Sequence, residues 1–173
     1  MEKQLFYSAL FLAGKPLDMK YLKKICDPFN LENRLITYVE EFNKLDTGIF
    51  IRSISGGFQM VVHPTLSTHL EDHFGERVEG VSRGALETVA IIAYKQPMTK
   101  AEIEKVRGVD CSGSMRSLLD KNLISVAGRK QVPGRPLLYV TTPYFLEYFG
   151  LKDLSELPTF REWQELRSRS TNE

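Results

Sequence analysis

The sequence is poor in the residues that most often bind metals or form disulfides. Its 173 residues include only 2 cysteines and 3 histidines. Cys26 and Cys111 are far apart and form no C-x-x-C pair, which argues against a disulfide framework or a zinc site and fits a reducing compartment. His69 and His73 stand four residues apart, but Leu70 stands where a zinc protease has glutamate. We therefore expect no metal site.

Long apolar runs and a strong net charge are also missing. No stretch approaches the ~18 apolar residues of a membrane-spanning helix, and the N-terminus lacks the charged leader and clean apolar block of a signal peptide. The 23 basic and 22 acidic residues nearly cancel, so only a local basic patch would bind nucleic acid. Hydrophobic residues make up 42%, enough for a packed core. We expect a soluble cytoplasmic protein without membrane association.

Catalytic motifs are absent as well. The glycine-bearing segments "SISGGF" and "VPGRP" lack the spacing of a phosphate-binding loop, and "VSRGAL" lacks the G-x-S-x-G spacing of a nucleophile elbow. The sequence also groups no nucleophile with a base and an orienting residue. We therefore expect neither enzymatic activity nor a cofactor.

The first half predicts three helices followed by a β-hairpin. The first helix, over residues 3–13, has more apolar positions than one buried face requires. These positions include Leu5, Phe6, Ala9, Leu10 and Leu12. Asp18 is a candidate N-cap of the second helix. Residues 49–62 alternate with a period of two, and Gly56 and Gly57 are expected to supply the positive dihedral angles of the turn.

The second half repeats this order after a linker. Residues 75–84, "GERVEGVSRG", combine glycine and charge as linkers do. Three helices and a hairpin follow, and Thr99 and Glu102 have the spacing of a capping box. In both halves the hairpin runs into a proline-started helix that finishes in Phe-Gly, which indicates an architectural repeat.

This order of elements is typical of winged helices. We expect an α+β, mainly helical chain with two tandem winged-helix (winged helix-turn-helix) domains, at residues 1–78 and 79–160. Residues 161–173, "REWQELRSRSTNE", are expected to form a charged, flexible tail.

A winged helix can bind either DNA or protein. The third helix of the second half offers few basic side chains and carries Asp120, so it is a poor recognition helix. The loop after it is more basic, and Arg129, Lys130 and Arg135 are candidates for contact with the DNA backbone. The surplus apolar surface of the helices near residues 3–13 and 86–94 indicates either a protein interface or a compact core, and these alternatives stay open.

Several strings resemble a known family. "LETVAIIAYKQP", "T-x-x-E-I-E-x-x-RGV" and "GR…VPGRPLLY" resemble the second half of the bacterial segregation and condensation protein B (ScpB) family. "LFLAGKPL" and "GGFQMVV" fit the first half, so that the resemblance covers about residues 4–160.

The resemblance implies a non-catalytic scaffold subunit. In this family the N-terminal winged-helix domain forms a homodimer, and the C-terminal domains bind the kleisin ScpA, which connects to the SMC ATPase. The assembly condenses and segregates chromosomes in the cytoplasm, on the nucleoid. DNA contact would be weak or indirect. The alternative function is a DNA-binding regulator or nucleoid protein that uses the basic wing.

The resemblance also implies site residues in this chain. The kleisin contacts are expected at Tyr94, Gln96, Pro97, Arg107, Gly108 and Val109. The dimer interface is expected on the apolar positions of the first helix named above, Leu5, Phe6, Ala9, Leu10 and Leu12.

Overall fold

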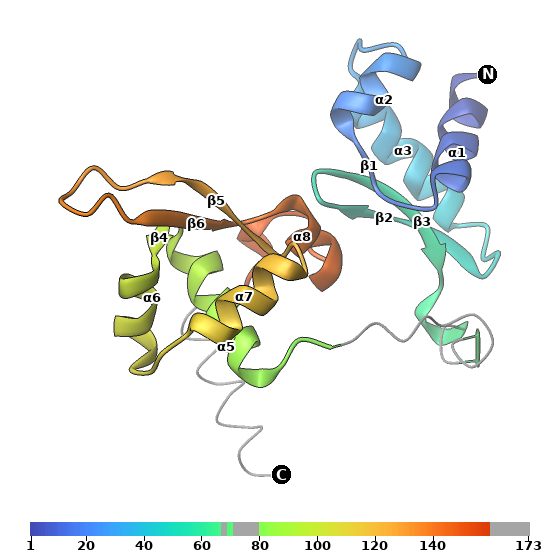
Figure 1. The fold of residues 1–173 in the computed structure, drawn as a ribbon. Coiled ribbons are helices and arrows are strands. Elements are labelled where there is room, and N and C mark those ends of the chain that lie inside the picture. The colour runs from blue at the N-terminus through green and yellow to red at the C-terminus, as the bar shows by residue number, and fades with distance from the viewer. Residues whose placement is uncertain (67–68, 71–79, 160–173) are drawn as a thin grey trace.

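The computed structural model describes residues 1–66, 69–70 and 80–159, which form a mixed fold of helices and two small antiparallel sheets (Figure 1). We call residues 1–66 the N-lobe and residues 80–159 the C-lobe. The predicted linker lies mostly outside the described residues, as do the boundary between residues 78 and 79 and the tail at 161–173. Among the helices described, none is long and apolar enough to cross a bilayer.

The N-lobe combines helices with a three-stranded sheet. In chain order they are α1 (Glu2–Ala13), β1 (Leu17–Asp18), α2 (Met19–Ile25), α3 (Leu31–Asn43), β2 (Ile49–Ile54) and β3 (Gly57–Val62). Helix α1 ends at Gly14, whose φ of 59° suits a residue without a side chain. The predicted cap of α2 is confirmed, because the Asp18 carboxylate accepts a hydrogen bond from the Tyr21 N–H.

The prediction for the hairpin turn was wrong by one residue. Positive φ angles occur at Ser55 (49°) and Gly56 (67°), whereas Gly57 already belongs to β3. Gly57 is needed for another reason: a Cβ at this position would lie 2.0 Å from the Leu17 carbonyl oxygen of β1. The sheet order is β1-β3-β2, so the hairpin pairs with a two-residue strand that the sequence pattern did not predict.

The N-lobe core is built around two aromatic rings. Phe6 of α1 and Phe58 of β3 meet edge to face with centroids 5.8 Å apart, a favoured geometry for aromatic pairs. The other buried members are Leu10, Leu17, Leu22, Cys26, Leu31, Leu35 and Ile51. Helices α1, α2 and α3 therefore all contribute side chains to one cluster.

The C-lobe repeats the element order of the N-lobe. It contains α5 (Arg83–Lys95), β4 (Met98–Thr99), α6 (Lys100–Arg107), α7 (Ser112–Asp120), β5 (Ile124–Arg129) and β6 (Leu137–Thr141), followed by α8 (Pro143–Phe149) and the short 3-10 helix η1 (Leu154–Glu156). The sheet order β4-β6-β5 matches that of the N-lobe sheet. The hairpin β5–β6, which we call the wing, extends away from the N-lobe (Figure 1).

Local capping signals define the helices of the C-lobe. The predicted capping box is confirmed: the Glu102 N–H donates to the Thr99 hydroxyl, and the Glu102 carboxylate accepts from the Thr99 N–H. Helix α8 begins with Pro143 after the cap Thr142. The core contains Ala85, Val89, Ile92, Ala93, Met98, Ile103, Cys111, Met115, Leu118, Leu123, Ile124 and Phe145.

Candidate partner-binding surfaces

Helix α1 presents two apolar faces, of which only one is buried. Phe6 and Leu10 are 0% and 1% exposed and lie in the core, so they offer no surface to a partner, in contrast to the predicted interface. Leu5 and Leu12 are exposed, and Ala9 is half-buried between them. Leu5, Ala9 and Leu12 recur at helical spacing, and we call them the open face of α1.

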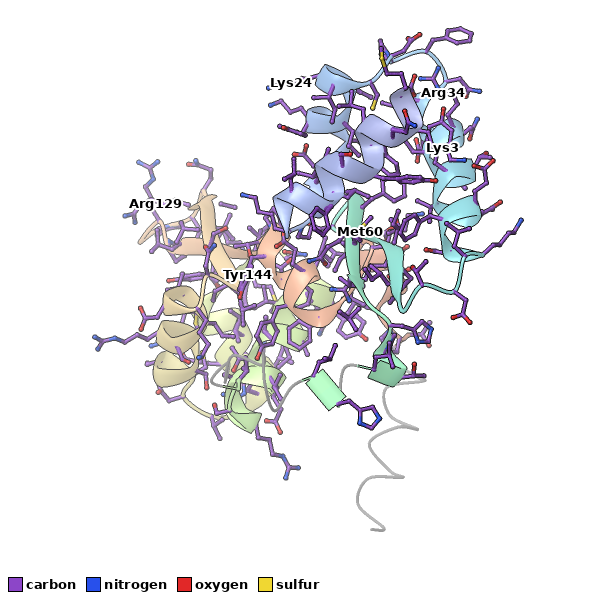
Figure 2. The ribbon with its side chains drawn as sticks, turned by 90° about the vertical axis from the view of Figure 1, so that its right-hand side faces the viewer. Lys3, Lys24, Arg34, Met60, Arg129 and Tyr144 are labelled. Carbon is purple, nitrogen blue, oxygen red and sulfur yellow. The ribbon has the colours of Figure 1, made fainter. Side chains whose placement is uncertain are left out.

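Polar contacts hold α1 firmly against α3. Lys3 forms an ion pair with Glu41, and the Arg34 guanidinium lies 3.0 Å from the Glu2 carboxylate. Figure 2 shows Lys3 and Arg34 on the same side of the N-lobe. The Tyr7 hydroxyl donates to a backbone carbonyl of α3 at 2.7 Å, and burial raises the pKa of this phenol. The open face therefore belongs to a helix that its contacts with α3 hold in place.

Two of the residues predicted to contact the kleisin are internal braces. The Gln96 side-chain oxygen accepts a hydrogen bond of 2.6 Å from the Thr141 N–H and so joins the end of α5 to β6. The Arg107 side chain is only 9% exposed, and its guanidinium lies 3.4 Å from the Glu87 carboxylate. Both residues hold C-lobe elements together, so little of either is offered to a partner.

Gly108 and Val109 line an open depression at the end of α6. Its volume is about 400 Å³, and Glu104 and Asp110 complete the lining. Gly108 ends α6 with φ 74°, which turns the chain so that Val109 is 56% exposed. The Lys100 ammonium lies 3.3 Å from Glu104 and 3.7 Å from Asp110. At the depression an exposed apolar side chain thus lies beside a group of charged side chains.

Tyr94 and Pro97 lie at the other end of α6. Both are exposed near the C-terminus of α5, and the Tyr94 hydroxyl donates to the Pro158 carbonyl. Pro97 precedes β4 and α6 in the chain and Val109 follows them, and the eight residues of α6 span about 12 Å at ~1.5 Å each. The predicted kleisin residues therefore form two surface groups.

Two of the three basic side chains predicted for the wing, Arg129 and Lys130, make contacts within the chain. Lys130 forms an ion pair with Glu102 of the capping box, and the Arg129 guanidinium donates to the Arg135 carbonyl at 3.1 Å. The hydrogen bonds that Glu102 accepts from Lys130 and then from Thr99 lower the pKa of its carboxyl to about 2. In Figure 2 Arg129 lies on the part of the wing remote from the N-lobe. The wing therefore has less free positive charge than its sequence indicates.

Two exposed apolar residues were not among the predicted contacts. Phe11 is a further exposed apolar side chain of α1, and Val106 is an exposed apolar side chain in the last turn of α6. Phe11 could have been identified from the apolar run "LFLAG", since two opposed faces cannot both enter one core. Val106 could not have been identified from the sequence, because it stands three positions after the buried Ile103 and this helical spacing also fits a buried residue.

No metal-binding group is apparent in the part of the chain that the structure describes. Within those ranges no three His, Cys, Asp or Glu side chains converge in a way that could hold a metal ion. Cys26 and Cys111 are buried in the two cores, and burial raises the pKa of both thiols. The candidate surfaces considered for a partner are therefore the open face of α1 and the two surface groups of the C-lobe.

Comparisons with known proteins single out one family. The family model described as segregation and condensation complex subunit ScpB matches residues 4–160. Segregation and condensation protein B of Moorella thermoacetica is 41% identical over 155 residues, which cover 88% of this chain and 80% of that protein. The protein of the same name from Syntrophotalea carbinolica is 39% identical over 97% of this chain and 86% of its own. The crystal structure of ScpB from Mycobacterium tuberculosis is 30% identical, covers 87% of this chain and 95% of that one, and has a TM-score of 0.40.

Proposed function

Because the chain belongs to the ScpB family of segregation and condensation complex subunits, we propose that it is a non-catalytic, homodimeric scaffold for chromosome condensation and segregation. It binds the kleisin ScpA directly and reaches the SMC ATPase through the kleisin. The observation that carries this proposal is the match over residues 4–160, which includes both lobes and nearly all described residues.

The proposed architecture is a pair of winged-helix domains. Each lobe has a helix, a short strand, two helices and a hairpin, and each has a three-stranded sheet of equivalent order, which supports this assignment. Each lobe also has its own buried cluster, as independent domains do. We propose domains at residues 1–78 and 79–160.

The N-lobe is the proposed dimerisation unit. The open face of α1 is an apolar surface on a helix that is held in place by α3. Burying such side chains contributes about 1.5–3 kcal/mol each, and a two-fold dimer counts every contact twice. Phe6 and Leu10 support the interface from within by anchoring α1, without touching the second copy.

The C-lobe is the proposed kleisin-binding unit. Val109 and Gly108 at the end of α6, and Tyr94 and Pro97 at its start, offer exposed contact groups. A partner segment that lies along α6 would contact both groups over about 12 Å, the length of two helical turns. Arg107 positions the end of α6 in this scheme, as Gln96 does for the end of α5.

The first test is size-exclusion chromatography with light scattering, on the protein alone and with a fragment of its cognate kleisin. The expected result is a dimer that forms a larger stable complex with the fragment. Val109→Asp should weaken this complex and leave the dimer intact, because the change lies in the C-lobe. The matched control is Val132→Asp in the wing loop, another exposed valine, which should leave both assemblies unchanged.

Salt dependence separates the scaffold from a DNA-binding protein. Phosphate contacts make affinity fall steeply with salt, whereas apolar docking does not. A monomer that ignores the kleisin fragment, yet shifts a DNA probe at low salt and loses this binding in Arg129→Ala, would contradict the proposed function.

A further inference from the structure

The turn of the β2–β3 hairpin has two backbone donors that its own sheet cannot use. Ile54 pairs with Gly57, which leaves Ser55 and Gly56 as the two turn residues, both with positive φ. In a two-residue turn of this kind the N–H groups of the central residues point away from the ladder. They need acceptors from elsewhere, either water or another part of the chain.

The chain that follows α8 offers acceptors in a rigid arrangement. Gly150 ends α8 with φ 70°, and the Leu151 N–H donates to the Leu146 carbonyl at 2.8 Å. The Lys152 N–H donates to the Glu156 carboxylate at 2.6 Å. Leu151 also packs against the C-lobe core, so the carbonyls of residues 151 and 152 are held in place by the C-lobe itself.

The turn and this segment bond directly to each other. The Ser55 N–H donates to the Leu151 carbonyl and the Gly56 N–H to the Lys152 carbonyl, each at 3.0 Å. The Ser55 hydroxyl donates to the Pro143 carbonyl at the start of α8, at 3.2 Å. Figure 1 shows the β2–β3 turn reaching toward α8. Three hydrogen bonds thus join residues that are about ninety positions apart in the sequence.

The neighbouring side chain of Arg52 fits the same contact. Its guanidinium nitrogen Nη1 lies 3.6 Å from the point where a Cβ on Gly150 would stand. The Gln59 side-chain oxygen on the neighbouring strand β3 accepts a hydrogen bond of 2.9 Å from Nη2, which fixes the guanidinium to the hairpin. The hairpin therefore meets the end of α8 through a side chain as well as through its turn.

We propose that this contact is a latch that makes the two lobes one rigid body. The lobes are then connected both by the chain between residues 66 and 80 and by the latch, so their relative orientation is set by the fold. One consequence is that the open face of α1 and the surface at Val109 point in fixed directions relative to each other. The latch depends only on hydrogen bonds within this chain, so it stands independently of the proposed scaffold function.

Hydrogen exchange on the unmodified protein tests the latch without any mutation. The Ser55 and Gly56 amides should exchange roughly fivefold more slowly than the Gly134 amide of the wing turn, after correction for intrinsic rates, because the net free energy of a typical hydrogen bond corresponds to about that factor. Gly134 is a suitable control because it also occupies a hairpin tip with positive φ. Exchange of all three amides at equal rates would overturn the proposal.

Disulfide trapping tests the same contact by geometry. Ser55→Cys with Lys152→Cys places two thiols on backbone segments that two hydrogen bonds join, and a disulfide needs α-carbons ~4–7 Å apart. The control pair Thr47→Cys with Lys152→Cys starts from the opposite end of the six-residue strand β2, roughly 20 Å away. Under mild oxidation the first pair should close within one chain, and the control pair should not.

Each outcome of the trapping experiment decides the question. A disulfide within one chain, identified by mass spectrometry at low protein concentration, supports the latch. Equal oxidation of both pairs, or no closure of the first pair, overturns it. A disulfide between two chains also overturns it and assigns the docking to a second copy. If the first pair does not fold, the exchange rates of the native chain decide.

Discussion

Replacing Leu12 with alanine should dissociate the proposed dimer without unfolding the N-lobe. Leu12 is 81% exposed, so the change removes almost no packing within the chain. Alanine is also the best helix former, so α1 should persist. We expect the free energy of unfolding of the monomer to change by no more than about 0.5 kcal/mol, as for other surface substitutions.

The effect on the dimer follows from the apolar surface removed. Leucine to alanine deletes three carbon groups at ~0.8 kcal/mol each, so about 2.4 kcal/mol per copy if Leu12 is fully buried at the interface. A two-fold interface contains the contact twice, which brings the total to about 5 kcal/mol. At ~1.4 kcal/mol per factor of ten, the dissociation constant should rise by up to roughly three orders of magnitude.

Sedimentation equilibrium over a dilution series measures this change, and Leu45→Ala is the matched control. Leu45 follows α3 and is 63% exposed, so the control removes a similar exposed side chain away from α1. The reasoning would be refuted by equal dissociation constants for Leu12→Ala and Leu45→Ala, or by a wild-type protein that stays monomeric at every concentration.

Three further predictions concern the folded chain itself. Gly57→Ala should lower the free energy of unfolding by about 3 kcal/mol or more, because the new Cβ would lie 2.0 Å from the backbone of β1. In the control Gly113→Ala the new Cβ meets open space on α7, so the free energy of unfolding should rise by about 0.5–1 kcal/mol. Urea titration measures both changes. Because the folded pKa of Glu102 lies at about 2, below its usual 4.5, its contribution to stability is present above pH ~4.5 and is lost as the pH falls toward 2. Glu102→Gln should therefore flatten the fall in urea midpoint between pH 5 and 3, and an equally steep fall would contradict this. Cys26 and Cys111 should react with a thiol reagent at pH 8 only as fast as the chain unfolds, because burial blocks access and raises the pKa of both thiols; fast native-state labelling of either residue would disprove it.

Local signals were sufficient to predict most of the helices. Asp18, Thr99 and Thr142 stand at helix starts where their side chains accept backbone N–H groups, and such caps depend on residues only three positions away. The strands β1 and β4 were not predicted, because two residues are too few to display a period of two. Their positions depend on pairing with β3 and β6, which lie far along the chain.

The predicted site residues also divide into features that a local sequence pattern indicates and roles that depend on distant contacts. The strings that resemble the ScpB family are contiguous, so the family could be recognised from sequence alone, and the match over residues 4–160 confirms it. The roles of Gln96 and Arg107 could not be recognised, because both lie in such strings while their partners, Thr141 and Glu87, lie 45 and 20 residues away. A motif shows that a residue belongs to the family pattern, but only its contacts show whether it braces the fold.

The sequence by itself determined the order of the main helices and the two hairpins, most helix ends, the surplus of apolar surface on α1 and the family. Only the tertiary structure decided that Phe6 and Leu10 enter the core while Leu5 and Leu12 stay outside, since both pairs fit helical spacing equally well. It also decided that Ser55 and Gly56 meet the carbonyls after α8. Backbone donors and acceptors are the same for every residue type except proline, so no sequence pattern indicates which distant pair will bond until the chain has packed.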